Sequence, residues 1–549
     1  MVALKRWATE RQLQDLLCEL VRIPSISGSA AEREFPKAVA GLLSEMPYFR
    51  EHPELLRSHP AEDGRELVTA LVRSKRPTSR TVVLLSHFDV VEIDCYGEWQ
   101  EHAFHAEELT RLFYDRPEAL PDDVRADVES GNWLFGRGVM DMKCGLAVHM
   151  SMLERAADGE FDGNVLLLAV PDEEVNSVGM RAAVPVLTAM AEELGLEYAL
   201  VLNAEAMHRP AEDDSIRYLE KGSIGKALPG YLCYGRETHV AQPFEGLNGN
   251  YMAAEITREL ELDASFCEEV DGYLAPPPTN LIQSSLMTSY SVTIPYRAVA
   301  MFNLLMLEKT VDELVAPLLG VAERAARRIE ERFAERVKRF ASLGGADRPD
   351  FKVKVLRYEE LLDIANRTFG EAQVKLAIAA AAEQLPPGAD DRQAAAAAVD
   401  AIALLCKHLA PMIVLFFAPP YYPPISSRND PFVNGLADRL SEYAKERHGM
   451  ELRSNSHHGA MLDLSYVGSE EAAASVRQLA ADMPLWGERY SIPFEAMEKF
   501  KVPVMNLGPF GKDAHKWTER LNRDHAFGKL PDVVAYCLKV VFEGANGEK

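Results

Sequence analysis

The strongest constraint on the fold is an uninterrupted apolar run, VLLLAV at 165–170, followed at once by Pro171 and three carboxylates. Six consecutive apolar residues predict a strand buried on both faces, and the proline marks its end. Asp172, Glu173 and Glu174 then stand together at the mouth of a buried strand, where like charges disfavour one another. The arrangement therefore predicts a nearby positive charge.

Strands and helices alternate through the first part of the chain. RTVVLLSH (80–87) and EYALVLNAEA (197–206) read as further strands, and helical segments such as MRAAVPVLTAMAEEL lie between the strands. This order predicts an α/β fold with a mostly parallel sheet sandwiched by helices. Residues 106–132 are polar and contain two prolines, so they are expected to form a surface insertion.

The pattern changes after about residue 212, where a strand–helix–strand–strand–helix order is typical of a small α+β domain. We therefore expect a first domain made of residues 1–211 and 359–549, interrupted by an inserted domain at 212–358. In the second segment, Ala-rich helices at 359–409 are expected to precede a strand, PMIVLFFAP, that resumes the α/β pattern.

Composition excludes several classes of protein. The formal charge of −25 over 549 residues argues against nucleic acid or an anionic membrane as the main partner. The longest apolar runs fall far short of the roughly 20 residues of a membrane span, and the N-terminus does not resemble a signal peptide. Seven scattered cysteines without a C-x-x-C pair are typical of reduced thiols, so a cytoplasmic location is expected.

Imidazoles and carboxylates recur just beyond the predicted strands or in glycine loops, at His87 and Asp89, Asp141, Glu205 and His515. Each alone is explained equally well by a turn, a cap or an ion pair. Together with 172–174 they would converge at one sheet edge, where ligands bind in open α/β sheets. A pair of divalent cations would resolve the resulting repulsion, and zinc accepts both imidazole nitrogen and carboxylate oxygen.

The chain contains His87-Phe88-Asp89, Gly136-Arg137-Gly138 with Asp141-Met142-Lys143, Asp172-Glu173-Glu174, Glu205 and GPFGKDAH, which ends at His515. In this order, the motifs resemble peptidase family M-twenty, a family that includes aminoacylases, acetylornithine deacetylase, succinyl-diaminopimelate desuccinylase and glutamate carboxypeptidases. Within it, the chain looks most like the arginine-utilisation (RocB-like) branch, which implies a place in arginine or amino-acid catabolism.

The resemblance implies two Zn²⁺ per chain, for which Co²⁺ or Mn²⁺ can substitute, bridged by Asp141. His87 and Glu205 would complete the shell of one metal, and Glu174 and His515 that of the other. The family often has a cis peptide after the bridging aspartate, here Asp141-Met142.

Four further roles follow from the resemblance. Asp89 would orient His87, and Glu173 would act as the general base. The inserted domain would be a lid and dimerisation domain, which implies a homodimer. Its His239 would stabilise the oxyanion, from the same subunit or from a partner.

One departure from the family concerns substrate recognition. Many relatives that act on N-acyl amino acids have a D-x-R motif in a lid strand, whose arginine binds the substrate carboxylate. This chain has Asn303-Leu304-Leu305 there, and Arg297 is a nearby alternative. The leading hypothesis is a metal-dependent hydrolase, of deacylase or peptidase type, acting on an amide or peptide bond of a small amino-acid-derived substrate. The alternative is a catalytically silent metal-binding relative that serves as a binding or regulatory protein.

Overall fold

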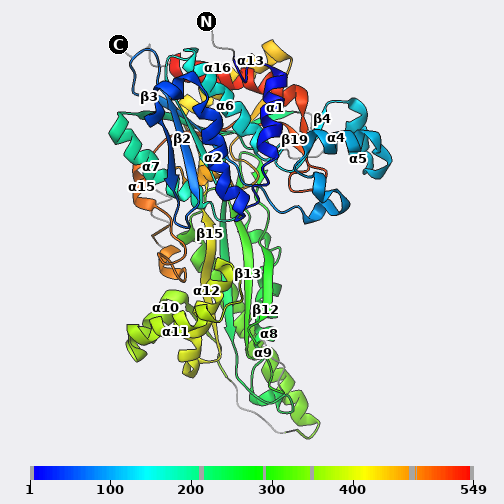
Figure 1. The fold of residues 1–549 in the computed structure, drawn as a ribbon. Coiled ribbons are helices and arrows are strands. Elements are labelled where there is room, and N and C mark those ends of the chain that lie inside the picture. The colour runs from blue at the N-terminus through cyan, green and yellow to red at the C-terminus, as the bar shows by residue number, and fades with distance from the viewer. Residues whose placement is uncertain are drawn as a thin grey trace. The chain divides into compact units, whose positions relative to one another are not determined.

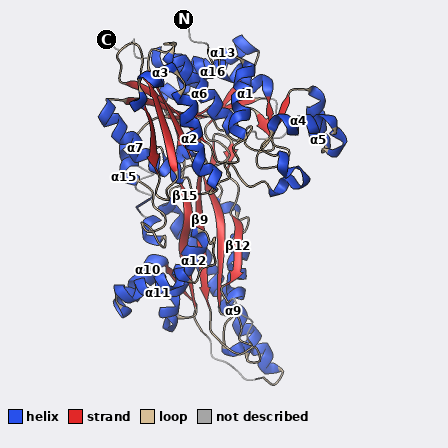
Figure 2. Ribbon diagram, in the orientation of Figure 1, coloured by secondary structure: helices blue, strands red, loops and turns tan. Residues whose placement is uncertain are grey.

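The computed structural model describes residues 5–208, 216–287, 292–345, 351–468, 476–477 and 479–543. Contacts within the chain divide it into two compact units, each with sheets and helices of its own (Figures 1 and 2). Unit 1 comprises Met1–Ile224, Ile425–Ser469 and Glu495–Lys549, and unit 2 comprises Gly225–Pro424 and Glu470–Phe494.

Unit 1 is built on an eight-stranded sheet in the order β1-β2-β5-β3-β6-β18-β7-β17. The four neighbouring strands β5, β3, β6 and β18 run parallel, whereas β1, β2 and β7 introduce antiparallel pairs. The strands are β1 (Leu56–Pro60), β2 (Glu66–Val72), β3 (Arg80–His87), β5 (Asn164–Val170), β6 (Glu197–Asn203), β7 (Arg217–Glu220), β17 (Leu452–Asn455) and β18 (Val504–Asn506). The predicted α/β class is confirmed.

Helices pack against this sheet through their apolar sides. Helix α6 is buried along most of its length and contacts β3 and β5, and Figure 1 shows it beside α1 and α2. Thr9 and Ser29 cap the starts of α1 and α2 through side-chain oxygens. The main helices are α1 (Glu10–Val21), α2 (Ala30–Ser44), α3 (Pro47–Glu51), α6 (Lys143–Ala157), α7 (Val178–Leu194), α13 (Pro431–His448), α15 (Phe494–Lys499) and α16 (Leu530–Glu543).

The polar stretch at 106–132 forms two helices, α4 (Ala106–Asp115) and α5 (Asp122–Ser130). Both bury an apolar side in a cluster that includes Phe113, Val124 and Val128. They lie next to a small sheet of β4 (Trp133–Phe135), β19 (Gly511–Lys512) and β20 (Arg520–Asn522). A further short ladder joins β8 (Gly222–Ser223) to β16 (Ile425–Ser426). The insertion is therefore a packed subdomain of unit 1, and more than a polar surface loop.

Unit 2 contains a five-stranded sheet in the order β12-β13-β9-β15-β14. Its strands are β9 (Gly225–Tyr234), β12 (Thr279–Ser285), β13 (Arg297–Met306), β14 (Lys354–Arg357) and β15 (Met412–Tyr422), and β10 (Glu269–Val270) and β11 (Tyr273–Leu274) form a separate hairpin. Its helices are α8 (Gly249–Leu260), α9 (Val311–Ser342), α10 (Tyr358–Phe369), α11 (Glu371–Glu383) and α12 (Asp391–Leu405).

The boundary expected at residue 358 does not coincide with the compact units, because residues 359–424 belong to unit 2. Helices α10 and α12 bury Leu361, Val399 and Ile402 in the same apolar cluster as the strands of the five-stranded sheet. Strand β15, which contains the run PMIVLFFAP, pairs with β9 and β14 in that sheet and does not resume the α/β pattern of unit 1. Its uniformly apolar sequence is typical of any central strand, so the sequence could not assign it to a sheet.

Candidate metal centre

Three parallel strands end at the same edge of the unit 1 sheet. The register pairs His87, the last residue of β3, with Val170, the last residue of β5, and Leu85 with Asn203, the last residue of β6. The residues that follow these strands are therefore delivered to one place. The loop after β5 carries Glu173 and Glu174, and the segment after β6 carries Glu205.

Asp141 comes from the loop between β4 and α6. Gly138 has φ +80°, and a Cβ added there would lie 2.8 Å from a methyl carbon of Val90, so both the conformation and the space require glycine. The loop ends in a cis peptide bond between Asp141 and Met142, and Lys143 begins α6.

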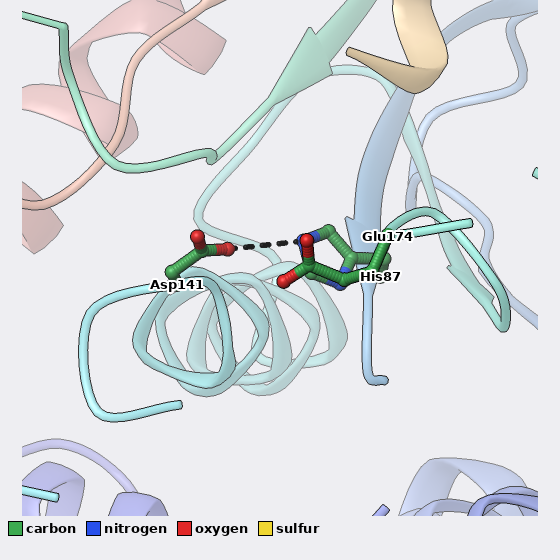
Figure 3. Close-up of side chains that lie close together, drawn as sticks. All are labelled: His87, Asp141 and Glu174. Carbon is green, nitrogen blue, oxygen red and sulfur yellow. Dashed lines mark ion pairs between the residues drawn. The ribbon is translucent and has the colours of Figure 1, made fainter. Parts of the chain in front are cut away.

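The two oxygens of Asp141 face two different histidines. Its Oδ1 lies 3.3 Å from His87 Nε2, and its Oδ2 lies 3.1 Å from His515 Nε2. Figure 3 shows His87, Asp141 and Glu174 side by side. The histidines are 428 positions apart in the sequence, and the aspartate lies between them in space.

Each histidine has a glutamate of its own. Glu205 Oε2 lies 3.1 Å from His87 Nε2, and Glu174 Oε2 lies 3.2 Å from His515 Nε2. Asn506 holds the backbone of Glu205 by accepting its N–H at 2.8 Å and donating to its carbonyl at 3.0 Å. The centre thus consists of two His–Glu pairs that share one aspartate, which we call the His87 half and the His515 half.

The ionisation of each of these groups depends on its burial and on its charged neighbours. Burial raises the pKa of Glu205 to about 8, and the neighbouring Asp141 carboxylate acts in the same direction. Hydrogen bonds to Asp141 and Glu174 raise the pKa of His515 to about 11. Burial acts to raise the pKa of Asp141, but hydrogen bonds from the two histidines hold it well below its usual value. Burial acts to lower the pKa of His87, but the neighbouring carboxylates raise it well above its usual value, so the carboxylates favour protons on both histidines.

Divalent cations could replace these protons. His87, Asp141 and Glu174 can each offer a ligand atom, all within 4.8 Å of one another. Mixed imidazole and carboxylate donors suit zinc and similar transition metals better than magnesium or calcium, which prefer oxygen. The donor set and its division around Asp141 fit a pair of such ions.

Glu173 belongs to neither His–Glu pair, although it is close to the centre. Its Oε2 lies 4.0 Å from His87 Nε2, and its side chain is 11% exposed. Burial raises its pKa well above the ordinary value, and the charge of His87 opposes this effect. A carboxyl group of raised pKa beside a metal site is suited to accept and return a proton.

Asp89 supports both His87 and the loop after β5. Its Oδ1 lies 3.4 Å from His87 Nδ1, and its carboxylate accepts the backbone N–H groups of Glu173 at 3.1 Å and Glu174 at 3.3 Å. Asp172 points elsewhere and pairs with Arg65 at 2.7 Å. Of the three consecutive carboxylates, Glu173 and Glu174 therefore lie at the centre and Asp172 does not.

Two residues singled out in the sequence lie in unit 2. His239 is at the surface of that unit, where its Nδ1 accepts the N–H of Ala241 at 3.1 Å, and its role stays a prediction. Arg297, the alternative ligand for a substrate carboxylate, forms an ion pair with Asp400 of α12. Burial raises the pKa of Asp400 to about 6, and Arg297 opposes this effect. The guanidinium of Arg297 is therefore already matched by a carboxylate of its own unit.

A buried ion pair behind the centre was not predicted from the sequence. Arg137 Nη1 lies 2.6 Å from Glu519 Oε2, and both side chains are at most 1% exposed. Arg137 also donates to the carbonyl of His515 at 3.1 Å, and Glu519 accepts the N–H of Met140 at 3.3 Å. Arg137 was visible within the GRG motif, whereas nothing in the sequence around Glu519 indicated a partner 382 positions away.

Comparison with known proteins identifies the family. The model of "Peptidase family M20/M25/M40" matches residues 83–539. The chain belongs to this peptidase family. It is 43% identical over 538 residues to the uncharacterized protein YqjN of Bacillus subtilis, covering 98% of this chain and 97% of YqjN. It is 28% identical over 536 residues to the protein RocB of the same organism, covering 95% of this chain and 93% of RocB.

A solved structure supports the fold assignment. The di-peptidase Dug1p of Saccharomyces cerevisiae aligns with a TM-score of 0.51 at 12% identity, covering 97% of this chain and 96% of that one. Membership of the family makes the chain a metal-dependent hydrolase. None of the helices in the described residues combines the length and hydropathy needed to span a bilayer.

Proposed function

We propose that the chain is a dinuclear zinc hydrolase that cleaves an amide or peptide bond of a small amino-acid-derived substrate. The observation that carries this proposal is the position of Asp141, whose two oxygens each face a separate His–Glu pair. A single ion would need only one such pair. Zinc is the proposed native metal, with cobalt or manganese as substitutes, because it accepts both donor types.

The proposed mechanism assigns each residue a separate role. His87, Asp141 and Glu205 would hold one ion, and Asp141, Glu174 and His515 the other. When bound, two such ions lower the pKa of a shared water and polarise the scissile carbonyl. Glu173 would take a proton from the attacking water and pass it to the leaving amine, a contribution of about 10²–10⁴-fold in rate.

Positioning depends on Asp89 and on the inserted unit. Asp89 would keep Glu173 in place, because its carboxylate holds the backbone N–H of that residue. His239 would donate to the oxyanion of the tetrahedral intermediate, a type of contact worth about 3–4 kcal/mol.

The proposed substrate class does not depend on an arginine of β13. Leu305 stands where many relatives of the family have the carboxylate-binding arginine, and Arg297 is paired with Asp400. Small peptides and N-acyl amino acids are the substrates to test first, because Dug1p is a di-peptidase. The amide of such a substrate would be recognised mainly at the metal centre.

The decisive experiment compares wild-type protein with Glu173→Gln. Metal content measured by plasma mass spectrometry should be about two ions per chain in both proteins. Turnover on a panel of dipeptides and N-acyl amino acids should fall by about 10²–10⁴-fold in the variant, because the general base is lost. Unchanged turnover in Glu173→Gln would show that Glu173 is not the general base. If the metal-loaded wild type hydrolysed no substrate of the panel, a binding protein would be favoured.

We further propose a cytoplasmic homodimer associated through unit 2. All seven cysteines are free, which suits a reducing compartment. Strand β12 stands at the end of the five-stranded sheet and leaves Leu281 52% exposed, as an edge strand open to pairing would. Light scattering gives the mass in solution, and a monomer at micromolar concentration would contradict the dimer.

A further inference from the structure

The loop that carries His515 has left-handed backbone at two positions. It connects β19 to β20, and its Asp513 and His515 have φ +60° and +67°, a region that residues other than glycine rarely adopt. The His515 side chain is 52% exposed, whereas that of His87 is 2% exposed. Contacts from elsewhere must therefore hold this loop in its conformation.

Asp127 of α5 binds residues on both sides of this loop. Its carboxylate accepts from Lys512 Nζ at 2.9 and 2.8 Å and from Arg520 Nε at 2.8 Å. Lys512 precedes the loop and Arg520 follows it, so one carboxylate joins the two ends.

Arg520 relays this contact into the loop. Its side chain is 1% exposed, and its Nη1 donates to Asp513 Oδ2 and, at 3.1 Å, to the carbonyl of Thr518. Asp513 also accepts from Thr518 Oγ1 at 2.8 Å. Asp513 and Thr518, which lie on either side of His515 in the loop, are therefore both bound by the guanidinium of Arg520. Asp127 in turn holds that guanidinium in place.

Two more residues contact the loop directly, one in the insertion and one just before it. The ring of Phe113 in α4 packs edge-on against Trp517, with centroids 5.7 Å apart. The thiol of Cys95 lies 3.6 Å from the carbonyl oxygen of His515. Asp127 and Phe113 of the insertion, together with Cys95 before it, thus contact the segment from Lys512 to Arg520.

We propose that the insertion formed by residues 106–132 is a clamp that holds the His515 half ready for metal, with Asp127 as its positioning residue. This inference rests on the proposed dinuclear function. The His87 half is held differently, by the end of β3 and by Asp89. Removing contacts of the clamp should therefore lower the affinity for the metal ion of the His515 half and leave the affinity of the His87 half unchanged.

The test is a Co²⁺ titration of the full-length, metal-free chain, followed by visible absorbance. Asp127→Asn keeps the size of the side chain but loses its charge, and Asp122→Asn on the same helix is the matched control because that side chain is 95% exposed. The first equivalent should bind Asp127→Asn as it binds wild type. The second should bind about 10–100-fold more weakly, the range seen when residues that orient a ligand are removed. Asp122→Asn should bind both as wild type does.

Phe113→Leu tests the same clamp through an uncharged contact, so the conclusion does not depend on one variant. It too should weaken only the second equivalent. Equal weakening of both equivalents in either variant would overturn the clamp. If wild type itself binds fewer than two equivalents, the proposed dinuclear centre fails and the clamp fails with it. Two wild-type equivalents with an unchanged Asp127→Asn titration would overturn the clamp alone.

Discussion

The two halves of the candidate centre contain the same donors but are built differently. His87 is 2% exposed at the end of a central strand, and Glu205 follows the neighbouring strand. His515 is 52% exposed, in a hairpin loop with left-handed backbone. The His87 half is positioned by the strands of the sheet, whereas the His515 half depends on contacts with side chains from distant segments of the chain.

This difference indicates how the family fold can keep one ligand rigid and adjust the other. A ligand fixed by a parallel sheet cannot move without disturbing the core, because buried strands are closely packed. A ligand on a loop is positioned by a few polar contacts, here those of Arg137, Asp127 and Arg520. Substitutions in each half should show whether the two behave as differently as their construction suggests.

The largest expected effect comes from removing each histidine in turn. His515→Ala should retain about one metal, bound with the affinity of the first wild-type equivalent, because the His87 half is intact. His87→Ala should lose that tight equivalent, since its two carboxylate partners remain buried without their imidazole. Both variants should lose turnover. Titration of Co²⁺ distinguishes them, and the same loss in both would show that the halves are not separate.

A smaller effect, on stability, is expected for the ion pair behind the centre. Arg137→Met leaves Glu519 buried without its cation, which should lower the free energy of unfolding by about 3–5 kcal/mol. Double replacement with Glu519→Gln should restore part of that loss, because the buried charge is then gone. Urea unfolding of the metal-free proteins measures both. If Arg137→Met lowered the free energy of unfolding by less than about 1 kcal/mol, the ion pair would contribute little to stability.

The smallest effect concerns pH and comes from two buried histidines of unit 1. Burial lowers the pKa of His149, which contacts Ser86 Oγ at 2.9 Å, and of His525, which accepts from Phe510 N at 3.1 Å, to about 3. The unfolded chain binds protons on these residues below about pH 6.5 and the folded chain does not. Their contribution to stability is therefore complete above pH 6.5 and is lost progressively as the pH falls towards 3.

Replacing either histidine checks this expectation. His149→Asn and His525→Asn should each make the decline in unfolding free energy between pH 7 and pH 5 shallower than in wild-type, metal-free protein. Urea unfolding at the two pH values provides the measurement. A decline as steep as that of wild type in both variants would exclude these histidines as its source.

The sequence predicted the parts of the centre that follow strands. His87, Glu174 and Glu205 lie at or just after the ends of apolar runs, and parallel strands deliver their ends to one edge, so local pattern and sheet geometry were enough. His515 and Asp141 were found through glycine loops of the family motifs. The contacts that Glu519 and Asp127 make around them could not be predicted, because such pairs join segments that only the folded chain brings together.

The limits of the sequence are equally clear for the domains. A small α+β region after residue 212 was expected, and unit 2 begins at Gly225. Its end was misplaced because α10–α12 and β15 have no feature that distinguishes a helix or strand of one unit from that of the other. Burial in a shared apolar cluster, which assigns them to unit 2, depends on tertiary packing.

Anomalous scattering from crystals of the metal-loaded chain tests the central claim most directly. We expect two peaks, one between His87, Asp141 and Glu205 and the other between Asp141, Glu174 and His515, with Asp141 shared. A single peak at full occupancy, or metal bound by a different set of residues, would contradict the dinuclear centre.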